Sequence, residues 1–412
     1  MITLRKPHGL IRHKVVLTAS KSESNRALII QAIQGHGIQI TNLAKARDTE
    51  TLINLLASDD EVKDVGPAGT TMRFLTAYLS CHHGSGQTYL LTGSDRMKQR
   101  PIGILTEALK QLGADISFPE KDGYPPLRIQ PSRLKSVPLK LDGSVSSQFI
   151  SALLMIGPSI EGGLTISFKG KLISRPYVNM TMNMMRYFGA HVEWSGDDIL
   201  VKEGKYQPGS FHVEGDWSAA SYWYTVAALS DDAELQIGGL KEDSLQGDSV
   251  CKEIFSLLGM ETVFEDDGLK IRRVRPVPER FEFDFVSCPD LAQTIAVVVS
   301  ALGVQSKLTG LETLRIKETD RIEALRVELA KFHVKVNVIG DEAIEIDPSA
   351  FTSASDIRIA TYEDHRMAMA FAPLVIKTGT LHIEDPDVVE KSYPDFWTDL
   401  EKCGFALTSA VV

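Results

Sequence analysis

The sequence predicts a two-domain α/β protein whose repeated units place apolar helices inside and strands outside. First, the chain has 412 residues, more than one ordinary hydrophobic core organises, which favours two domains. Second, a helical run that ends in a small turn and continues as an extended segment recurs along the chain. Third, several expected helices are apolar on almost every side, which is typical of helices buried inside a domain.

The recurring unit lies around Gly113, Gly189, Gly259, His333 and Gly404. Its copies are "ILTEALKQLGADISF", "MTMNMMRYFGAHVEW", "VCKEIFSLLGMETVF", "IEALRVELAKFHVKVNV" and "FWTDLEKCGFALT". Their spacing of roughly 70 residues is long for a solenoid and reasonable for an α/β unit. Glycine after the last helical turn suits a left-handed C-cap. One or two copies can be explained because many αβ units end in this way. Five copies instead favour duplication of an ancestral unit within the chain.

The apolar helices and the strands between them suggest the layers. Expected buried helices include "SSQFISALLMI", "SAASYWYTVAAL" and "LAQTIAVVVSAL", and strand-like runs such as "GLTISF" and "GTLHIED" adjoin Gly or Asp turns. The boundaries are expected near Ala19–Lys21 and near Glu214–Asp216, where "VEGDWSAAS" passes from strand to turn to helix.

Composition and charge exclude several classes of function. The chain is 43% hydrophobic and 24% charged, as in soluble globular proteins. Its net charge of -10 argues against a nucleic-acid partner, which requires a broad basic surface. No secretory signal is evident, and no apolar run approaches the roughly 18 residues of a membrane span. The cysteines Cys81, Cys251, Cys288 and Cys403 are scattered, so reduced thiols in a cytoplasmic protein are expected, without a zinc site or disulfide framework.

The stretch "LRIKETDRIEAL" contains an anomaly. An amphipathic helix is expected from Ile322, and Lys317 and Arg321 lie in or just before its first turn, four apart, so that both can face one side. A cation at the positive end of a helix is disfavoured by about 0.3–1 kcal/mol.

Other expected helix starts also carry cations: Lys21, Arg26, Arg73, Arg100, Arg175, His365, Arg366 and Lys391. For any one of them, a solvated side chain or a local ion pair, such as Glu318 with Arg321, is the simpler interpretation. Taken together they favour convergence on a ligand with several negative charges, because helix N-termini and arginine forks both bind anions. Gly69 in "PAGTT" would let such a ligand approach the backbone. Cap-type hydroxyls nearby are Ser22, Ser24, Thr70, Ser146, Ser147 and Thr319.

Four acids lie among these cations: Asp216, Asp290, Glu318 and Asp364. Each is a proton-transfer candidate if it faces the ligand. Asp216 and Asp364 precede helices and fit the role of helix caps, and Asp290 fits it as well. Glu318 is harder to explain as a cap, because it lies between Lys317 and Arg321.

The motifs together resemble the 5-enolpyruvylshikimate-3-phosphate (EPSP) synthase family. They are "SKSESNRAL", "AGTTMR", "RMKQRPIG", "DGSVSSQF", "SRPY", "KETDR", "DHRMAM" and "EKSYPDFW", in order over nearly the whole chain. The resemblance implies a two-domain inside-out α/β barrel, each domain made of three βαβαββ-type repeats. It also implies a first domain of residues 1–20 plus 216–412, completed by both chain ends, a second domain of residues 21–215, and an active site in the cleft between them.

The resemblance implies transfer of enolpyruvyl from phosphoenolpyruvate to the 5-hydroxyl of shikimate 3-phosphate, with release of phosphate and no metal or cofactor. Implied shikimate 3-phosphate contacts are Lys21, Ser22, Arg26, Ser146, Ser147, Gln148, Ser174, Tyr177, Asp290, Thr313 and Lys317. Implied phosphoenolpyruvate contacts are Lys21, Gly69, Arg100, Gln148, Arg321, Arg366 and Lys391. Asp290 matches the base, a role it shares with Lys21, and Glu318 matches the acid that protonates the methylene carbon. A cytoplasmic monomer is expected.

The chain departs from the family's pattern in places, and rivals exist. Pro67 and Thr313 stand where many members have Asn, and Phe74 where Pro is frequent, so sensitivity to the herbicide glyphosate stays open. The sister enolpyruvyl transferase that acts on UDP-N-acetylglucosamine carries a reactive cysteine in the loop that matches "GSDRMKQRP", and this loop has none. A non-catalytic scaffold that binds phosphorylated ligands would not need Asp290 and Glu318 together.

Overall fold

The computed structural model describes residues 1–7, 9–81, 86–170, 172–173, 175–231, 233–265 and 268–409. The chain forms two compact units. Unit 1 comprises Met1–Ala19 and Glu214–Val412, and unit 2 comprises Ser20–Val213. That each unit is an independent domain, with the active site between the two, stays a prediction.

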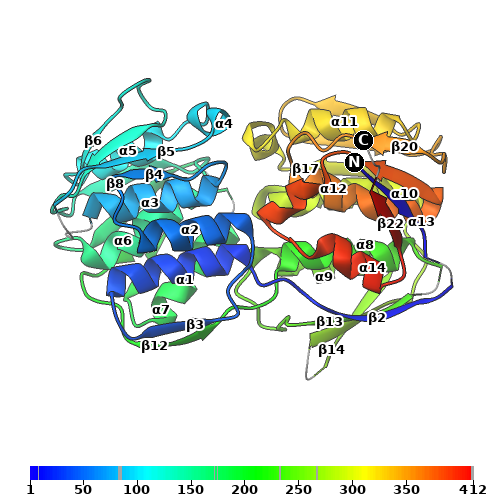
Figure 1. Ribbon diagram of the computed structural model, residues 1–412, viewed down its shortest axis with the longest axis horizontal. Coiled ribbons are helices and arrows are strands. Elements are labelled where there is room, and N and C mark those ends of the chain that lie inside the picture. Colours follow the sequence, from blue (N-terminus) through cyan, green and yellow to red (C-terminus); the bar gives the residue numbers. More distant parts are fainter. Residues whose placement is uncertain are drawn as a thin grey trace. The chain divides into compact units, whose positions relative to one another are not determined.

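Within the described part of unit 2, the strands form two four-stranded sheets and one parallel pair (Figure 1). The first sheet has the order β4-β5-β7-β6, and the second has the order β8-β9-β11-β10. The pair is β3 with β12. The strands are β3 (Ile38–Thr41), β4 (Val62–Asp64), β5 (Tyr89–Thr92), β6 (Asp115–Ser117), β7 (Leu127–Gln130), β8 (Pro138–Asp142), β9 (Leu164–Lys169), β10 (Val192–Ser195), β11 (Asp198–Val201) and β12 (Gly209–His212).

The described part of unit 1 contains three four-stranded sheets. Their orders are β2-β13-β15-β14, β16-β17-β19-β18 and β20-β21-β1-β22. The strands are β1 (Ile2–Arg5), β2 (Ile11–Val16), β13 (Ala233–Gly238), β14 (Met260–Glu265), β15 (Gly268–Arg273), β16 (Arg280–Asp284), β17 (Gln305–Thr309), β18 (Lys335–Ile339), β19 (Ala343–Asp347), β20 (Ile357–Ile359), β21 (Thr380–Ile383) and β22 (Ala406–Ser409).

All five four-stranded sheets share one topology. The first two strands pair in parallel, as β8 does with β9, and the second also pairs antiparallel with the last, as β9 does with β11. In the sheet of β20, the chain's N-terminal strand β1 takes the position of the last strand. Parallel neighbours need a helical crossover, which α6 supplies between β8 and β9. The predicted βαβαββ repeat is therefore confirmed.

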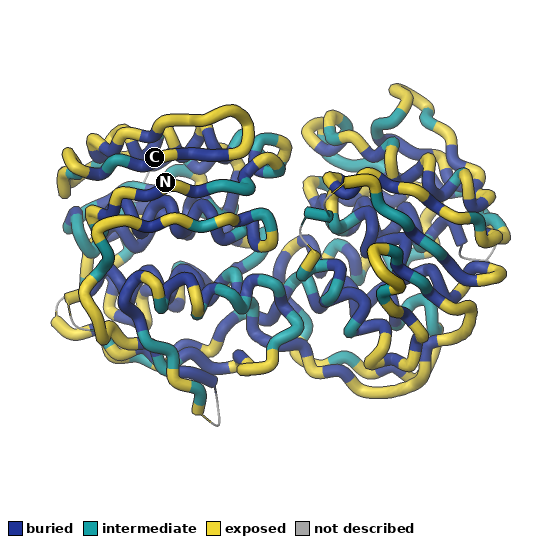
Figure 2. The backbone as a smooth tube through the Cα atoms, turned by 180° about the vertical axis from the view of Figure 1, so that it is seen from behind, coloured by how far each residue is buried: buried dark blue, intermediate teal, exposed yellow. Residues whose placement is uncertain are grey.

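The helices form the interior of each unit, as Figure 2 shows by the buried colouring of the central helical segments. In unit 2 they are α1 (Lys21–Gln34), α2 (Arg47–Ala57), α3 (Gly69–Cys81), α4 (Asp95–Lys98), α5 (Gly103–Gln111), α6 (Ser147–Ile156), α7 (Arg175–Tyr187) and the 3₁₀ helix η1 (Gly157–Ser159). In α3, every residue except Thr70 and Tyr78 is buried.

In unit 1 the α-helices are α8 (Trp217–Leu229), α9 (Cys251–Leu257), α10 (Ala292–Leu302), α11 (Arg321–Ala330), α12 (His365–Phe371), α13 (Val375–Thr378) and α14 (Phe396–Lys402). The 3₁₀ helices are η2 (Gly247–Val250), η3 (Phe285–Ser287), η4 (Pro289–Leu291), η5 (Glu312–Ile316), η6 (Ala372–Leu374) and η7 (Pro386–Lys391). α8 is buried except at Ser218, and α10 except at Leu302. Each buried Leu, Ile or Val contributes about 1.5–3 kcal/mol, so these helices are a main source of unit 1's stability.

The strands bury only one face. In β8 and β17, buried and exposed residues alternate along most of the strand, as they do in a sheet with one solvated side. Buried helices with half-exposed sheets around them confirm the inside-out layering expected from the apolar helices.

The helix-turn-strand units end as the sequence predicts. Gly113, Gly189, Gly259 and Gly404 have φ of 102°, 81°, 88° and 92°, a region that glycine enters without steric cost. His333 occupies the corresponding position with φ 61°.

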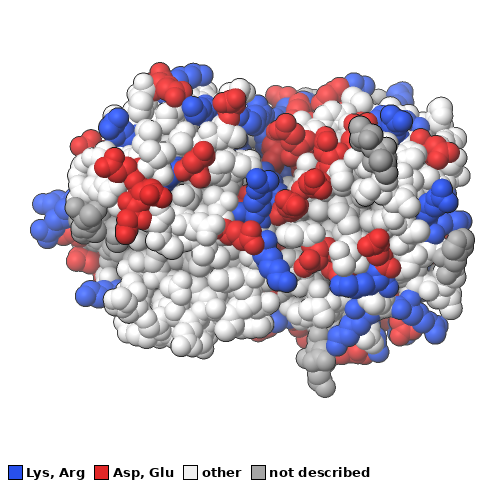
Figure 3. Space-filling model, viewed as in Figure 1, with Lys and Arg blue, Asp and Glu red and all other residues white. Residues whose placement is uncertain are grey.

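The viewed face in Figure 3 carries both signs of charge, except over a broad area at the lower left that is almost free of charged side chains. Among the helices of the described residues, none combines the length and apolar character needed to cross a membrane.

Candidate active site

The start of α3 brings two arginines against a glycine in unit 2. A Cβ atom on Gly69 would lie 2.7 Å from Arg100 Nη1 and 3.2 Å from Arg73 Nη1. Arg73 Nη1 also donates a hydrogen bond of 3.0 Å to the Gly69 carbonyl. Only glycine fits beside both guanidinium groups without displacing one of them.

The next two residues of α3 connect this point to other predicted site residues. Thr70 Oγ1 accepts a hydrogen bond of 3.0 Å from Gln148 Nε2. Thr71 Oγ1 donates to the Asp48 carbonyl at 3.0 Å, and Asp48 Oδ2 pairs with Lys21 Nζ at 3.2 Å. Three consecutive residues of α3 therefore link Arg100, Gln148 and Lys21. We use the name unit 2 cluster for these three residues together with Gly69, Arg73 and Asp48.

Arg100 is a cation of this cluster for which the described residues supply no counter-charge. It is half-buried, and within the part of the chain that the structure describes its side chain has no hydrogen-bond or ion-pair partner. An unpaired guanidinium next to a helix N-terminus is suited to bind a carboxylate or phosphate.

Arg26 lies in the second turn of α1, and its side chain contacts other protein groups rather than solvent. It is 2% exposed and donates to Thr181 Oγ1 at 2.7 Å, to Ser151 Oγ at 3.1 Å and to the Ser22 carbonyl at 2.9 Å. Burial lowers the pKa of Arg26 to about 10, against the opposing charges of Tyr177 and Glu23. An anionic ligand would provide the buried cation with the charge partner that these hydroxyls cannot supply.

The remaining predicted residues of unit 2 lie at two helix starts. Ser146 is the N-cap of α6 and accepts from the Gln148 N–H at 3.3 Å, and Ser147 is the first helical residue. Tyr177 is half-buried in the first turn of α7. Ser174 lies outside the described residues.

In unit 1, Arg321 is the centre of a charge network. It is the first residue of α11 and is 1% exposed. Its Nε donates to Asp364 Oδ2 at 2.7 Å, its Nη1 to Asp290 Oδ1 at 3.1 Å and its Nη2 to Glu318 Oε2 at 2.9 Å. Burial lowers the pKa of Arg321, but Asp364, Glu318 and Asp290 outweigh it and hold the pKa above its ordinary value.

Asp290 lies in η4 and pairs with three cations. Besides Arg321, it accepts from Arg366 Nη2 at 3.0 Å and lies 3.6 Å from Lys317 Nζ. Burial raises the pKa of Asp290, but the charges of Arg366, Lys317 and Arg321 lower it by more than burial raises it. The net pKa therefore lies well below the ordinary value. In the absence of substrate this carboxylate is ionised and is a weak proton acceptor.

Glu318 joins Arg321 to Lys391. Its Oε1 accepts from Lys391 Nζ at 2.7 Å while its Oε2 accepts from Arg321. We call Asp290, Lys317, Glu318, Arg321, Asp364, Arg366 and Lys391 the unit 1 cluster. It contains one more cation than carboxylates, so a further anion would be attracted to it.

Arg366 is held by α8 as well as by Asp290. Its guanidinium donates to Ser218 Oγ at 3.3 Å and Tyr222 OH at 3.5 Å. Ser218 Oγ in turn donates to Asp248. Burial raises the pKa of Tyr222 to about 12, so its hydroxyl stays protonated at neutral pH.

Comparison with known proteins identifies the family of this chain. The family model for EPSP synthase (3-phosphoshikimate 1-carboxyvinyltransferase) matches residues 52–400. The chain belongs to the EPSP synthase family. A relative from Bacteroides fragilis (strain YCH46), named 3-phosphoshikimate 1-carboxyvinyltransferase, is 46% identical over 398 residues, with 96% of each chain covered. One of the same name from Photobacterium damsela subsp. piscicida is 37% identical over 426 residues, covering 96% of this chain and 98% of the relative.

Solved structures support the fold. An EPSP synthase from Acinetobacter baumannii superposes with a TM-score of 0.80 at 19% identity, covering 100% of both chains. A second structure from the same organism gives 0.79 at 20% identity, covering 99% of this chain and 100% of the other. The two-domain inside-out α/β fold of EPSP synthases is therefore that of this chain.

The structure also locates the cations of the EPSP synthase motifs relative to their helices. Lys317 is the C-cap of η5 and lies just before α11, which begins at Arg321, as predicted. Both side chains nevertheless reach Asp290, so they face one side through tertiary contact rather than helical spacing. Lys391 is the last residue of η7 and lies just ahead of α14, as predicted.

The predicted helix caps are confirmed in part. Asp216 and Asp364 are N-caps, of α8 and α12, and Asp364 is in addition a partner of Arg321. The cap of α11 is Asp320 rather than Thr319, and that of α1 is Ser20 rather than Ser22. Thr313 Oγ1 is buried and has no partner among the described residues, as expected of a hydroxyl that awaits a ligand or water.

Sequence reasoning missed Asp48, Ser218 and Tyr222. Ser218 and Tyr222 are one helical turn apart in α8, and this spacing of polar groups in an apolar helix was their only signal. Asp48 carried no signal, because its pairing with Lys21 depends on how α1 and α2 pack.

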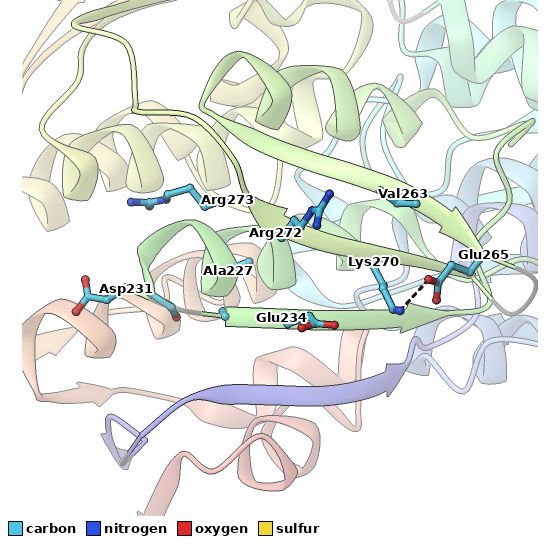
Figure 4. A pocket seen from close by; sticks show the side chains of 10 residues that line it. Ala227, Asp231, Glu234, Val263, Glu265, Lys270, Arg272 and Arg273 are labelled. Carbon is cyan, nitrogen blue, oxygen red and sulfur yellow. Dashed lines mark ion pairs between the residues drawn. The ribbon is translucent and has the colours of Figure 1, made fainter.

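A separate groove of about 450 Å³ lies along β13, β14 and β15 in unit 1, lined by residues such as Ala227, Glu234 and Arg273 (Figure 4). Two of its cations are paired locally: Lys270 pairs with Glu265 at 2.8 Å, and Arg272 pairs with Glu261 at 2.5 Å, while Arg273 donates a hydrogen bond to the Ala228 carbonyl. Among the described residues, no three His, Cys, Asp or Glu side chains are grouped as metal ligands.

Proposed function

We propose that residues of both clusters together bind the two substrates of enolpyruvyl transfer. Phosphoenolpyruvate would be held by Lys21, Gly69, Arg100, Gln148, Arg321, Arg366 and Lys391. Shikimate 3-phosphate would be held by Lys21, Ser22, Arg26, Ser146, Ser147, Gln148, Ser174, Tyr177, Asp290, Thr313 and Lys317. The observation that carries the proposal is the unit 1 cluster, where Asp290 and Glu318 are embedded among Lys317, Arg321, Arg366 and Lys391.

The reaction needs an acid, a base and cations. Protonation of the methylene carbon of phosphoenolpyruvate builds positive charge on the neighbouring carbon. The 5-hydroxyl of shikimate 3-phosphate attacks that carbon and loses its proton, which gives a tetrahedral ketal phosphate. A proton then leaves the new methyl group as phosphate departs, and cations stabilise the leaving phosphate.

Glu318 is the proposed acid, and substrate binding would make it one. Without substrate, Arg321 and Lys391 stabilise its charged form. When the carboxylate and phosphate of phosphoenolpyruvate take over these cations, the Glu318 carboxylate loses their stabilisation and binds a proton more readily. In the structure without substrate, the carboxylates of the unit 1 cluster thus pair with the cations that would otherwise bind the substrate's negative charges.

Asp290 is the proposed base, together with Lys21. Arg366 and Arg321 depress the pKa of Asp290, and sharing these arginines with phosphoenolpyruvate would raise it toward the value a proton acceptor needs. Lys21 pairs with Asp48 at 3.2 Å and would have to release a proton before it could accept one.

A phosphate-release assay with shikimate 3-phosphate and phosphoenolpyruvate tests the proposal. We expect phosphate to be released only when both are present. A chain that releases none, or that releases it with UDP-N-acetylglucosamine in place of shikimate 3-phosphate, would overturn the proposed substrates. A parallel series with glyphosate measures the effect of Pro67 and Phe74, which flank Gly69.

The proposal includes a monomer that acts in the cytoplasm. A monomer suffices because one chain carries both clusters, and membership of a biosynthetic pathway with phosphorylated intermediates supports a cytoplasmic location. Light scattering at assay concentration tests the monomer, and a mass corresponding to two chains would contradict it.

A further inference from the structure

Two buried charges of α11 face the same segment of unit 1. Arg321 begins the helix, and Glu328 lies two helical turns later on the same face; both are buried, Glu328 completely. A buried carboxylate is costly unless it is hydrogen-bonded or paired. The partners of Glu328 are therefore expected to matter.

These partners lie in residues Arg358–Asp364, which lead into α12 and which we call the approach segment. Glu328 Oε2 accepts from the Ala360 N–H at 3.2 Å and from Lys331 Nζ at 2.7 Å. Glu328 Oε1 accepts from Tyr362 OH at 2.8 Å. Lys331 Nζ also donates to the Arg358 carbonyl at 2.7 Å.

The far end of the approach segment is held by Arg321. Asp364 binds Arg321 through Oδ2 at 2.7 Å, and its Oδ1 accepts from the Arg366 N–H at 2.8 Å. Side chains of α11 therefore form hydrogen bonds with the approach segment at both of its ends. The residues that follow the segment are His365 and Arg366 of α12.

Between the contacts with Glu328 and the contact with Arg321, the backbone of the approach segment is strained. Tyr362 and Glu363 have φ of 54° and 56°, and a non-glycine residue in this left-handed region costs of order 1 kcal/mol or more. Two such residues in succession persist only where surrounding contacts determine them. Tyr362 itself supplies one contact, through its hydroxyl on Glu328.

We propose that Glu328 and Tyr362 are positioning residues that set the placement of Arg366 for phosphoenolpyruvate. The carboxylate holds the approach segment in its left-handed turn, and that turn directs Asp364 to Arg321 and Arg366 to Asp290. Neither Glu328 nor Tyr362 needs to touch a substrate. This inference rests on the proposed role of Arg366 in binding phosphoenolpyruvate.

The test is the substrate dependence of Glu328→Gln and Tyr362→Phe. Both remove hydrogen bonds to the approach segment, and Tyr362→Phe leaves Ala360 and Lys331 on the carboxylate, so it is the milder change. We expect KM for phosphoenolpyruvate to rise at least fivefold, with a smaller change in KM for shikimate 3-phosphate. Glu323→Gln, an exposed glutamate of α11 that pairs with Arg326 at 2.5 Å, is the matched control and should stay within twofold.

Strain provides a rescue experiment. Asn enters the left-handed region several-fold more readily than most residues, so Glu363→Asn added to Glu328→Gln should recover part of the lost affinity for phosphoenolpyruvate. Unchanged KM in both single variants, equal loss for both substrates, or no rescue would overturn the proposal. If wild type itself releases no phosphate, the proposed function fails first, so the two failures are distinguishable.

Discussion

At the scale of residues, the carboxylates of the unit 1 cluster differ in the cations that they contact. Glu318 uses one oxygen for Arg321 and the other for Lys391. Asp290 contacts Lys317, Arg321 and Arg366. The two acids thus have different sets of counter-charges, which is how one site assigns different proton-transfer roles to two carboxylates.

Glu318→Gln should abolish most turnover while leaving substrate binding largely intact. Gln keeps the shape of the side chain but cannot donate a proton to carbon, and loss of a general acid typically costs about 100-fold or more in kcat. Steady-state kinetics should show KM for both substrates within a few-fold. Glu323→Gln is the control, and wild-type turnover in Glu318→Gln would remove Glu318 from its role.

Asp290→Asn should destabilise the protein at neutral pH and less so in acid. The change leaves Arg366, Lys317 and Arg321 without this carboxylate, at a cost of roughly 1.5–3 kcal/mol. Because the folded-state pKa of Asp290 is depressed, its contribution is complete above the unfolded value of about 3.9 and is lost as pH falls through the folded pKa.

Urea unfolding at pH 7, 5 and 3 measures this. The difference between wild type and Asp290→Asn should be equal at pH 7 and 5 and smaller at pH 3. Asp341→Asn removes an exposed partner of Arg315 and should change stability by no more than about 0.5 kcal/mol. A difference that grows on acidification would contradict the depressed pKa.

At this scale the sequence predicted residue types well and partners poorly. Glu318 and Arg321 were paired from their spacing alone, and the structure confirms that pair. Asp48, Ser218 and Tyr222 escaped, because their partners are far away in the chain and are reached only when helices pack.

At the scale of elements, helix starts organise both clusters. α3 links Arg100, Gln148 and Lys21 through its first three residues. α11 presents Arg321 at its first position, where Asp320 accepts from the N–H groups of Ile322 and Glu323 at 3.1 Å each. The carboxylates around Arg321 offset the unfavourable position of a cation at this end of the helix.

Asp320→Ala should cost about 1 kcal/mol of stability through loss of the cap. Asp320 also pairs with Arg315 at 3.0 Å, so the first turn would loosen and KM for phosphoenolpyruvate should rise with it. Asp320→Asn retains a cap and should behave like wild type in thermal unfolding. Equal losses in both variants would show that charge, not capping, is what matters.

Gly69→Ala should weaken phosphoenolpyruvate binding. The added methyl group would lie 2.7 Å from Arg100 Nη1, so the guanidinium must move. Gly204→Ala is a matched control, because its Cβ would meet nothing within 4 Å. An unchanged KM for phosphoenolpyruvate in Gly69→Ala would separate Arg100 from that substrate.

At the scale of the whole molecule, the unit 1 cluster and the unit 2 cluster each contain more cations than carboxylates. Arg100 in unit 2 has no partner among the described residues, and the cations of the unit 1 cluster outnumber its carboxylates. If the substrates bind between the units, as we propose, their negative charges remove a repulsion that opposes closure.

Small-angle scattering should therefore detect a smaller radius of gyration when both ligands are added. Shikimate 3-phosphate and phosphoenolpyruvate are added to the Glu318→Gln variant, which is expected to bind both substrates with little turnover during the measurement. An equal concentration of sulfate controls for ionic strength. An unchanged radius would count against closure.

The sequence alone predicted the repeat, the inside-out layering, the family and a set of candidate site residues, because periodicity, glycine C-caps and the reaction's need for acids and cations all leave local patterns. Tertiary structure alone decided how those charges are paired without substrate, that Lys317 and Arg321 meet through Asp290, and that Glu328 restrains a left-handed turn ahead of Arg366. These depend on distances between residues far apart in the chain, which only packing sets.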